Sequence, residues 1–213
     1  MGLNRYLRAL IKRWGTTRSK GRVWDKEYGG GHWNVSVPSA TDAPRPRNQV
    51  YEVVEKYARG GAILDLGCGT GLVAAETCRS YREYVGVDIS AAAIRFAEAE
   101  LTKCPELCSK ASFRVDDISR FTPTVNFSVI LFGEVLYYFP KGRIRALLRH
   151  HSRFLSGDGV LIARLHDRRR YRHILEIIDS EWRVIEVRTP SHGTSATVVF
   201  RPARPLEQIG NGN

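Results

Sequence analysis

Three glycines that follow an apolar run are the residues whose spacing predicts a ligand site. Asp65 stands in the run 63–66, and Gly67, Gly69 and Gly71 come after it at alternate positions. Glycine lets the backbone bend sharply and lets a ligand approach without meeting a Cβ atom. In an open α/β sheet, ligands bind outside the carboxyl ends of the strands. The pattern therefore predicts a ligand at the end of the strand 62–66.

Two ligand classes fit such a turn, a dinucleotide and S-adenosylmethionine, and the glycine spacing separates them. The dinucleotide fingerprint G-x-G-x-x-G needs its third glycine at position 72. The sequence has Leu72 there, and its third glycine, Gly71, comes one residue early. The spacing therefore disfavours a dinucleotide.

Carboxylates also end the next two predicted strands. Asp88 closes the strand 84–88 and can accept both hydroxyls of a ribose, and Asp117 follows the strand 111–115, where it can bond an adenine amino group. Together with Asp65 they attract a sulfonium and an ammonium, whereas they would repel a pyrophosphate. The charges favour S-adenosylmethionine.

The segments 65–71 and 87–90 resemble the class I S-adenosylmethionine-dependent methyltransferases, and the resemblance covers roughly residues 47–165. It implies a doubly wound α/β fold, with a seven-stranded, mostly parallel sheet in the order 3-2-1-4-5-7-6 and an antiparallel last strand. Helices would cover both faces. It also implies which residues bind the cofactor: Asp65, Gly67, Cys68, Gly69, Gly71, Asp88, Ile89, Asp117 and Ile118.

Residues 133–139, which read GEVLYYF, resemble a narrower group within that family. This group is the nodulation protein S type, small N-methyltransferases that act on a chitooligosaccharide amine. The likeness is confined to a short segment, and it assigns no acceptor to this chain.

Methyl transfer from a sulfonium has an excellent leaving group, so placing the acceptor and removing its proton are the remaining tasks. Glu134 follows the strand 127–132 and can orient or deprotonate the acceptor, or instead bond the cofactor or cap a loop. His166 follows the strand 160–165 and is the histidine best placed to act as a base, or is a solvated loop residue. The spacing of Cys104 and Cys108 lacks histidine partners, so we expect no metal.

The acceptor side is less well defined by sequence. The segment after the strand 127–132 lacks the Pro-Pro pair typical of enzymes that methylate nucleobase amines. Tyr137 and Tyr138 are expected to line an acceptor pocket, with one of the two in the core. Trp33, in a glycine-rich cap, is the tenth residue expected to bind the cofactor, because the cap can place an aromatic ring against the sulfonium. Tyr28, which precedes this cap, is expected to contact the acceptor or to stack near the sulfonium. Arg168 begins a basic patch that suits an anionic or sugar acceptor.

The sequence therefore favours methyl transfer to an O or N atom of a small polar acceptor. Two alternatives stay open: an RNA methyltransferase that uses a basic N-terminus, and a cofactor-binding subunit without chemistry of its own. Binding to nucleic acid is disfavoured because no RNA-binding signature is present. The sequence does not predict an oligomeric state.

Basic residues are concentrated at the N-terminus. The net charge is +11, and residues 1–22 hold seven lysines and arginines but no acid. Leu3, Leu7, Leu10 and Trp14 recur at helical spacing, which predicts a basic amphipathic helix. Four interpretations remain: a lid or docking helix over the active site, a solvated basic face, a surface for a membrane or nucleic acid, and an Arg-rich targeting peptide.

The 213 residues favour one main domain, with alternating strands and helices from residue 62 onward. We expect an N-terminal helix and cap over 1–46, a methyltransferase domain over 47–203 and a flexible tail over 204–213. The helix 143–154 is expected to carry His150 and His151 on its surface, and residues 156–159 are expected to form a turn. Four irregularly spaced cysteines and the lack of an apolar run of about 18 residues predict a cytoplasmic protein without a membrane span.

Overall fold

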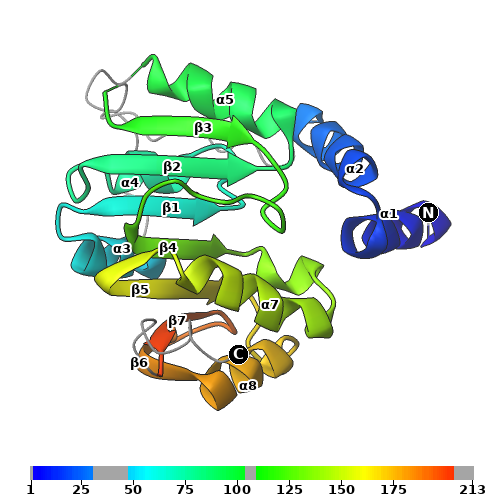
Figure 1. Ribbon diagram of the computed structural model, residues 1–213. Coiled ribbons are helices and arrows are strands. Elements are labelled where there is room, and N and C mark those ends of the chain that lie inside the picture. The colour runs from blue at the N-terminus through cyan, green and yellow to red at the C-terminus, as the bar shows by residue number, and fades with distance from the viewer. Residues whose placement is uncertain (1, 31–47, 104–108, 204–213) are drawn as a thin grey trace, which may run out of the picture.

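The computed structural model describes residues 2–30, 48–103 and 109–203, with the side chains of residues 2–5 left out. Trp33, the predicted boundary between residues 46 and 47 and the predicted tail lie outside these ranges. The described chain folds around one seven-stranded sheet with the order β3-β2-β1-β4-β5-β7-β6, as predicted (Figure 1). Strands β1 to β5 pair in parallel, and β7 runs antiparallel between β5 and β6.

The strands span the following residues: β1 Ala62–Leu66, β2 Glu83–Asp88, β3 Ala111–Val115, β4 Phe127–Gly133, β5 Leu155–Leu165, β6 Trp182–Arg188 and β7 Ala196–Pro202. The helices are α1 Gly2–Trp14, α2 Thr17–Gly29, α3 Gln49–Ala58, α4 Leu72–Glu76, α5 Ala91–Leu101, η1 Leu136–Tyr138, α7 Lys141–Ser152 and α8 Arg172–Glu181. All five residues of β1 are buried, as expected for a central strand that is covered on both faces.

Two apolar clusters hold the sheet between its helices. Leu64 and Leu66 of β1 pack with residues of α7 and α8, while the alternate residue Ile63 packs with residues of α3 and α4. This alternation follows from the two-residue period of a strand. Because β1 to β5 run parallel to one another, their carboxyl ends lie at one edge of the sheet. Helices α1 and α2 lie beyond that edge (Figure 1).

Two local predictions were wrong. Residues 156–159 are not a turn between elements, because β5 already begins at Leu155, which pairs with Phe127 of β4. Gly159 permits this pairing, since a Cβ atom there would lie 2.8 Å from the carbonyl oxygen of Phe127. His151 is not on the surface but fully buried, where its Nε2 lies 2.9 Å from the carbonyl oxygen of Ile118.

The segment that follows α1 is also more regular than expected. Residues 17–29 form helix α2, whose Thr16 accepts a hydrogen bond from the backbone N–H of Ser19 as an N-cap. Tyr28 therefore belongs to a helix rather than to a glycine-rich loop. The placement of α2 decides how the site is covered.

Candidate active site

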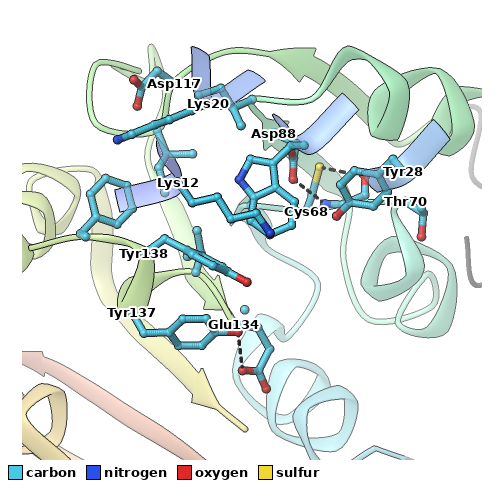
Figure 2. Close-up of a pocket in the computed structure, with 18 of the residues that line it drawn as sticks. Lys12, Lys20, Tyr28, Cys68, Thr70, Asp88, Asp117, Glu134, Tyr137 and Tyr138 are labelled. Atoms are coloured by element: carbon cyan, nitrogen blue, oxygen red, sulfur yellow. Dashed lines mark hydrogen bonds between the residues drawn. The ribbon is translucent and has the colours of Figure 1, made fainter. Parts of the chain in front are cut away.

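A cavity of about 340 Å³ lies where β1, β2 and β4 end, under α1 and α2 (Figure 2). Its walls come from the glycine turn, the ends of the strands, η1 and the two N-terminal helices. The lining residues are Lys12, Lys20, Trp24, Tyr28, Gly67, Cys68, Gly69, Thr70, Leu72, Asp88, Ile89, Asp117, Ile118, Gly133, Glu134, Val135, Tyr137, Tyr138 and Phe139. Seven of the ten residues predicted to bind the cofactor are in this set: Gly67, Cys68, Gly69, Asp88, Ile89, Asp117 and Ile118.

The glycine turn forms the floor of the cavity in a conformation that requires glycine. Gly67 and Gly69 have φ angles of 85° and 54°, which side chains rarely adopt. A Cβ atom on Gly69 would lie 2.9 Å from the hydroxyl oxygen of Tyr28, and one on Gly67 would lie 3.0 Å from Val135. The backbone is thus exposed to the cavity at a position where no side chain fits.

Asp88 is fixed at the edge of this turn. The Gly69 N–H donates to its Oδ2 at 3.0 Å, and the Ser90 N–H donates to its Oδ1 at 2.9 Å. Burial raises the pKa of Asp88, and the hydrogen bonds from Ser90 and Gly69 oppose that rise. Each oxygen keeps acceptor capacity toward the cavity, because a carboxylate has about four acceptor positions.

Asp117 closes the far end of the cavity and is held by α2. The Thr17 hydroxyl donates to its Oδ2 at 2.7 Å, while the backbone N–H and the hydroxyl of Ser119 donate to its Oδ1. Although burial raises the pKa of Asp117, these hydrogen bonds from Thr17 and Ser119 outweigh it, and the net pKa is lowered. Asp117 is therefore an ionised acceptor beside Ile118.

Asp65 lies behind the turn and is not among the lining residues. It is 2% exposed, and the hydroxyl of Tyr84 donates to its Oδ2 at 2.5 Å. Its Oδ1 has no hydrogen-bond partner among the described residues. Burial raises the pKa of Asp65 to about 7. Gly71 is likewise outside the cavity, where it packs against Phe113.

Helix α2 supplies cavity residues that the sequence analysis missed. Lys20, Trp24 and Tyr28 follow each other at four-residue spacing, so they share one face of the helix, and all three line the cavity. Lys12 joins them from α1, with its Nζ 3.6 Å from the Trp24 ring centroid and 2.6 Å from Oε2 of Glu27. The four-residue spacing was the available signal, and only Tyr28 was singled out.

The two predicted catalytic residues lie together at the end of β4. Glu134 has a φ of 57°, and its Oε1 accepts a hydrogen bond from Nη1 of Arg164 at 2.9 Å. Its Oε2 accepts the backbone N–H of His166 at 2.8 Å and lies 3.1 Å from Nδ1 of His166. Glu134 faces the cavity, whereas His166 is half-exposed at its rim and is not a lining residue. Arg164 and His166 thus hold the side chain of Glu134, whose backbone has a φ angle that residues other than glycine rarely adopt.

The predicted acceptor residues divide into two groups. Tyr137 and Tyr138 both line the cavity and are partly buried, so neither is a pure core residue. The ring of Tyr138 meets that of Trp24 edge-on at 4.9 Å, and Tyr137 donates to Oε2 of Glu134 at 3.2 Å. Arg168 points elsewhere, because its Nη1 bonds the carbonyl oxygens of Gly193 and Ser195.

Comparison with known proteins agrees with this geometry. Residues 63–159 match the family model described as "Methyltransferase domain". Chondramide synthase cmdD of Chondromyces crocatus is 30% identical over 135 residues, which are 61% of this chain and 3% of that protein. The magnesium-protoporphyrin O-methyltransferase of Rhodobacter capsulatus is 37% identical over 79 residues, which are 37% of this chain and 34% of that protein. The chain therefore spans only a small part of these relatives.

Among solved structures, the N-methyltransferase NodS of Bradyrhizobium japonicum WM9, in complex with S-adenosyl-L-homocysteine, has a similar fold. The TM-score is 0.67 at 16% identity, and the match covers 84% of this chain and 98% of that one. This is the group that residues 133–139 resemble in sequence. Residues 63–159 thus match a methyltransferase domain in sequence, and the strand order and the glycine turn are those that the resemblance to class I S-adenosylmethionine-dependent methyltransferases implies.

Proposed function

We propose that this protein transfers a methyl group from S-adenosylmethionine to an O or N atom of a small polar acceptor. The observation that carries the proposal is the shared cavity. At one side Asp88 is fixed against the glycine turn, and at another Glu134 faces the same space from the end of β4. The proposed donor site and a carboxylate that can accept a proton thus share one cavity.

The residues present fit the donor. Gly67 and Gly69 leave backbone exposed where a Cβ atom would not fit, and the carboxylates of Asp88 and Asp117 suit the ribose and the adenine. The ring of Tyr28 lines the cavity beside Gly69 and favours positive charge, whereas the Trp24 ring already carries the ammonium of Lys12 at 3.6 Å. When bound, S-adenosylmethionine supplies an electrophilic methyl group on a sulfonium.

Glu134 is the residue we assign to the acceptor. Its carboxylate can accept a hydrogen bond from an acceptor N–H or O–H, orient that atom and take up the proton that the new bond to carbon displaces. Arg164, His166 and Tyr137 hold the carboxylate by hydrogen bonds. His166, half-exposed at the rim, provides a route by which that proton reaches solvent.

The two helices and the aromatic side chains that cover the cavity favour a small acceptor. Helices α1 and α2 lie across the ends of the strands, and four aromatic side chains narrow the space: Trp24, Tyr28, Tyr137 and Tyr138. A volume of about 340 Å³ lies within the range of small-molecule sites. With the donor bound, the remaining space suits a small group rather than a folded macromolecule.

A turnover screen with methyl-labelled S-adenosylmethionine tests the proposal on amino sugars, polyols and other small amines and alcohols. We expect Glu134→Gln to lower kcat on the best acceptor by about 100-fold or more, since general bases contribute about that much. The affinity for S-adenosylhomocysteine should change less than twofold. Glu176→Gln, an exposed residue of α8, is the matched control and should keep full activity.

Three outcomes would contradict the proposal. Equal losses of turnover and product affinity in Glu134→Gln would place Glu134 in the donor site instead. Methyl transfer to RNA alone, with a steep fall in binding as salt increases, would favour a nucleic-acid substrate. Binding of S-adenosylhomocysteine with no transfer to any acceptor would indicate a subunit without chemistry.

A further inference from the structure

Helix α1 presents an apolar face to solvent. Of the seven large hydrophobic side chains that the described residues expose, four lie in this one helix. They are Tyr6 at 65%, Leu7 at 54%, Leu10 at 40% and Trp14 at 67% relative exposure. At 100° per residue these four positions fall within an arc of about 100°. The exposure is therefore one continuous stripe and not four scattered side chains.

The other side of α1 is tied to the body of the protein. Lys12 lies more than a quarter-turn away from each of the four apolar positions, where it pairs with Glu27 and stacks on Trp24 of α2. Lys12 also lines the cavity. The contacts of Lys12 fix the rotation of α1, so the apolar stripe faces outward while the opposite side closes the site. Figure 1 shows α1 at the edge of the molecule, with α2 between it and α5.

The charge around this stripe selects the partner. Residues 1–22 hold seven cations and no acid; Lys12 and Lys20 line the cavity, whereas Arg13 lies beside Trp14 at 5.9 Å from its ring. On α2 the exposed residues Arg18, Arg22 and Lys26 repeat at four-residue spacing. A cationic surface requires an anionic partner. A nucleic acid would satisfy the charges but would leave the leucines in water, whereas an anionic bilayer accommodates both.

We propose that α1 lies in the interface of an anionic lipid bilayer, with its apolar stripe at the boundary between headgroups and acyl chains and with Arg13 and the exposed Arg18, Arg22 and Lys26 against the headgroups. Tyr and Trp favour this depth, and Leu side chains gain by leaving water. The binding is peripheral, since no helix of the described chain is long and apolar enough to cross a bilayer. The proposal is independent of the proposed enzymatic function.

Vesicle sedimentation with the full chain tests this surface. Vesicles of phosphatidylcholine and phosphatidylglycerol in a 3:1 ratio are compared with vesicles of phosphatidylcholine alone. We expect the wild type to bind the anionic vesicles at least tenfold more tightly and to lose that binding as salt increases. The double variant Leu7→Glu/Leu10→Glu should bind at least tenfold more weakly. Val187→Glu, at a site of matched exposure of 55% on β6, should bind as the wild type does.

Quenching of Trp fluorescence in the wild type tests the proposal without relying on a variant that could fail to fold. Brominated lipids quench a Trp that enters the interface, so we expect quenching in the wild type and a much smaller effect in Trp14→Phe. The proposal is wrong if the wild type shows neither vesicle binding nor quenching, or if Leu7→Glu/Leu10→Glu binds as well as the wild type. It is also wrong if the stripe serves only self-association, seen as a wild-type dimer that the variant lacks, without vesicle binding. Binding of a model RNA by wild type and variant alike, without vesicle binding, would assign the cations to nucleic acid.

Discussion

At the scale of single residues, the site depends on carboxylates whose surroundings differ. Asp88 is bonded to two backbone N–H groups at the cavity, Asp117 is kept ionised by hydroxyl donors, and Asp65 is buried with one oxygen unpaired among the described residues. Sequence spacing predicted that Asp65 and Asp88 lie at the ends of strands and that Asp117 follows one. It could not predict the different roles, because the partner of Asp117 is Thr17, one hundred residues away.

Replacement of Asp88 tests the donor site directly. Asp88→Asn removes the charge that would accept the ribose hydroxyls while keeping the size of the side chain. We expect the affinity for S-adenosylhomocysteine to fall by about 1.5–3 kcal/mol, or about 10- to 150-fold, as for hydrogen bonds to a charged group. Calorimetry measures the change, and Asp158→Asn, an exposed aspartate of β5, is the control. An unchanged affinity in Asp88→Asn would mean that the donor binds elsewhere.

The pKa of Asp65 predicts how stability depends on pH. Folding raises this pKa from 3.8 to about 7, so between these values the unfolded chain binds fewer protons and the folded state loses stability as pH rises. His151 acts in the opposite direction, because burial lowers its pKa from 6.5 to about 4 and stability rises with pH in that window. The contribution of Asp65 is therefore isolated by comparison with Asp65→Asn.

Urea unfolding from pH 5 to pH 8 makes that comparison. We expect the midpoint of the wild type to fall relative to that of Asp65→Asn as pH increases, most steeply between pH 5 and pH 7, whereas the titration of His151 is common to both proteins and cancels in the comparison. Asp158→Asn should follow the wild type throughout. Parallel profiles for the wild type and Asp65→Asn would show that Asp65 titrates alike in the folded and unfolded chains.

At the scale of secondary-structure elements, α2 connects the ends of three strands, β1, β2 and β3, that form the proposed donor site. Tyr28 packs on Gly69 after β1, Asp25 bonds Ser90 and Ala92 after β2, and Thr17 bonds Asp117 after β3. Strands and hairpins were predictable from apolar runs and turn residues. Helix α2 was not, because its polar sequence is stabilised by these contacts rather than by an apolar stripe of its own.

Asp25 is the contact that best tests this role of α2. Its Oδ1 accepts hydrogen bonds from the hydroxyl of Ser90 and from the N–H of Ala92 in the first turn of α5. Loss of such a cap costs about 0.5–2 kcal/mol. In Asp25→Ala we expect faster hydrogen exchange across residues 17–29 and weaker binding of S-adenosylhomocysteine. The exposed neighbour Lys26→Ala should change neither, and unchanged exchange in Asp25→Ala would show that α2 does not depend on this contact.

At the scale of the whole molecule, the sheet places every segment of the proposed donor site at one edge, because its parallel strands end together. The strand order could be predicted from the resemblance, and the turn, the acids and Glu134 were found from their positions after strands. The sequence predicted a helix in residues 1–22 and offered a lid over the active site as one interpretation, but it could not predict how α1 and α2 dock, because the docking depends on contacts such as that between Lys12 and Glu27. The family core is thus readable from local patterns, whereas the N-terminal addition requires tertiary structure.

Calorimetric titration of the purified chain with S-adenosylhomocysteine, followed by NAD⁺, tests most directly whether the glycine turn and its carboxylates bind an adenosyl donor without a pyrophosphate. We expect saturable binding of one S-adenosylhomocysteine per chain and no heat from NAD⁺ at the same concentration. Binding of NAD⁺, or no binding of S-adenosylhomocysteine, would contradict the assignment of this cavity.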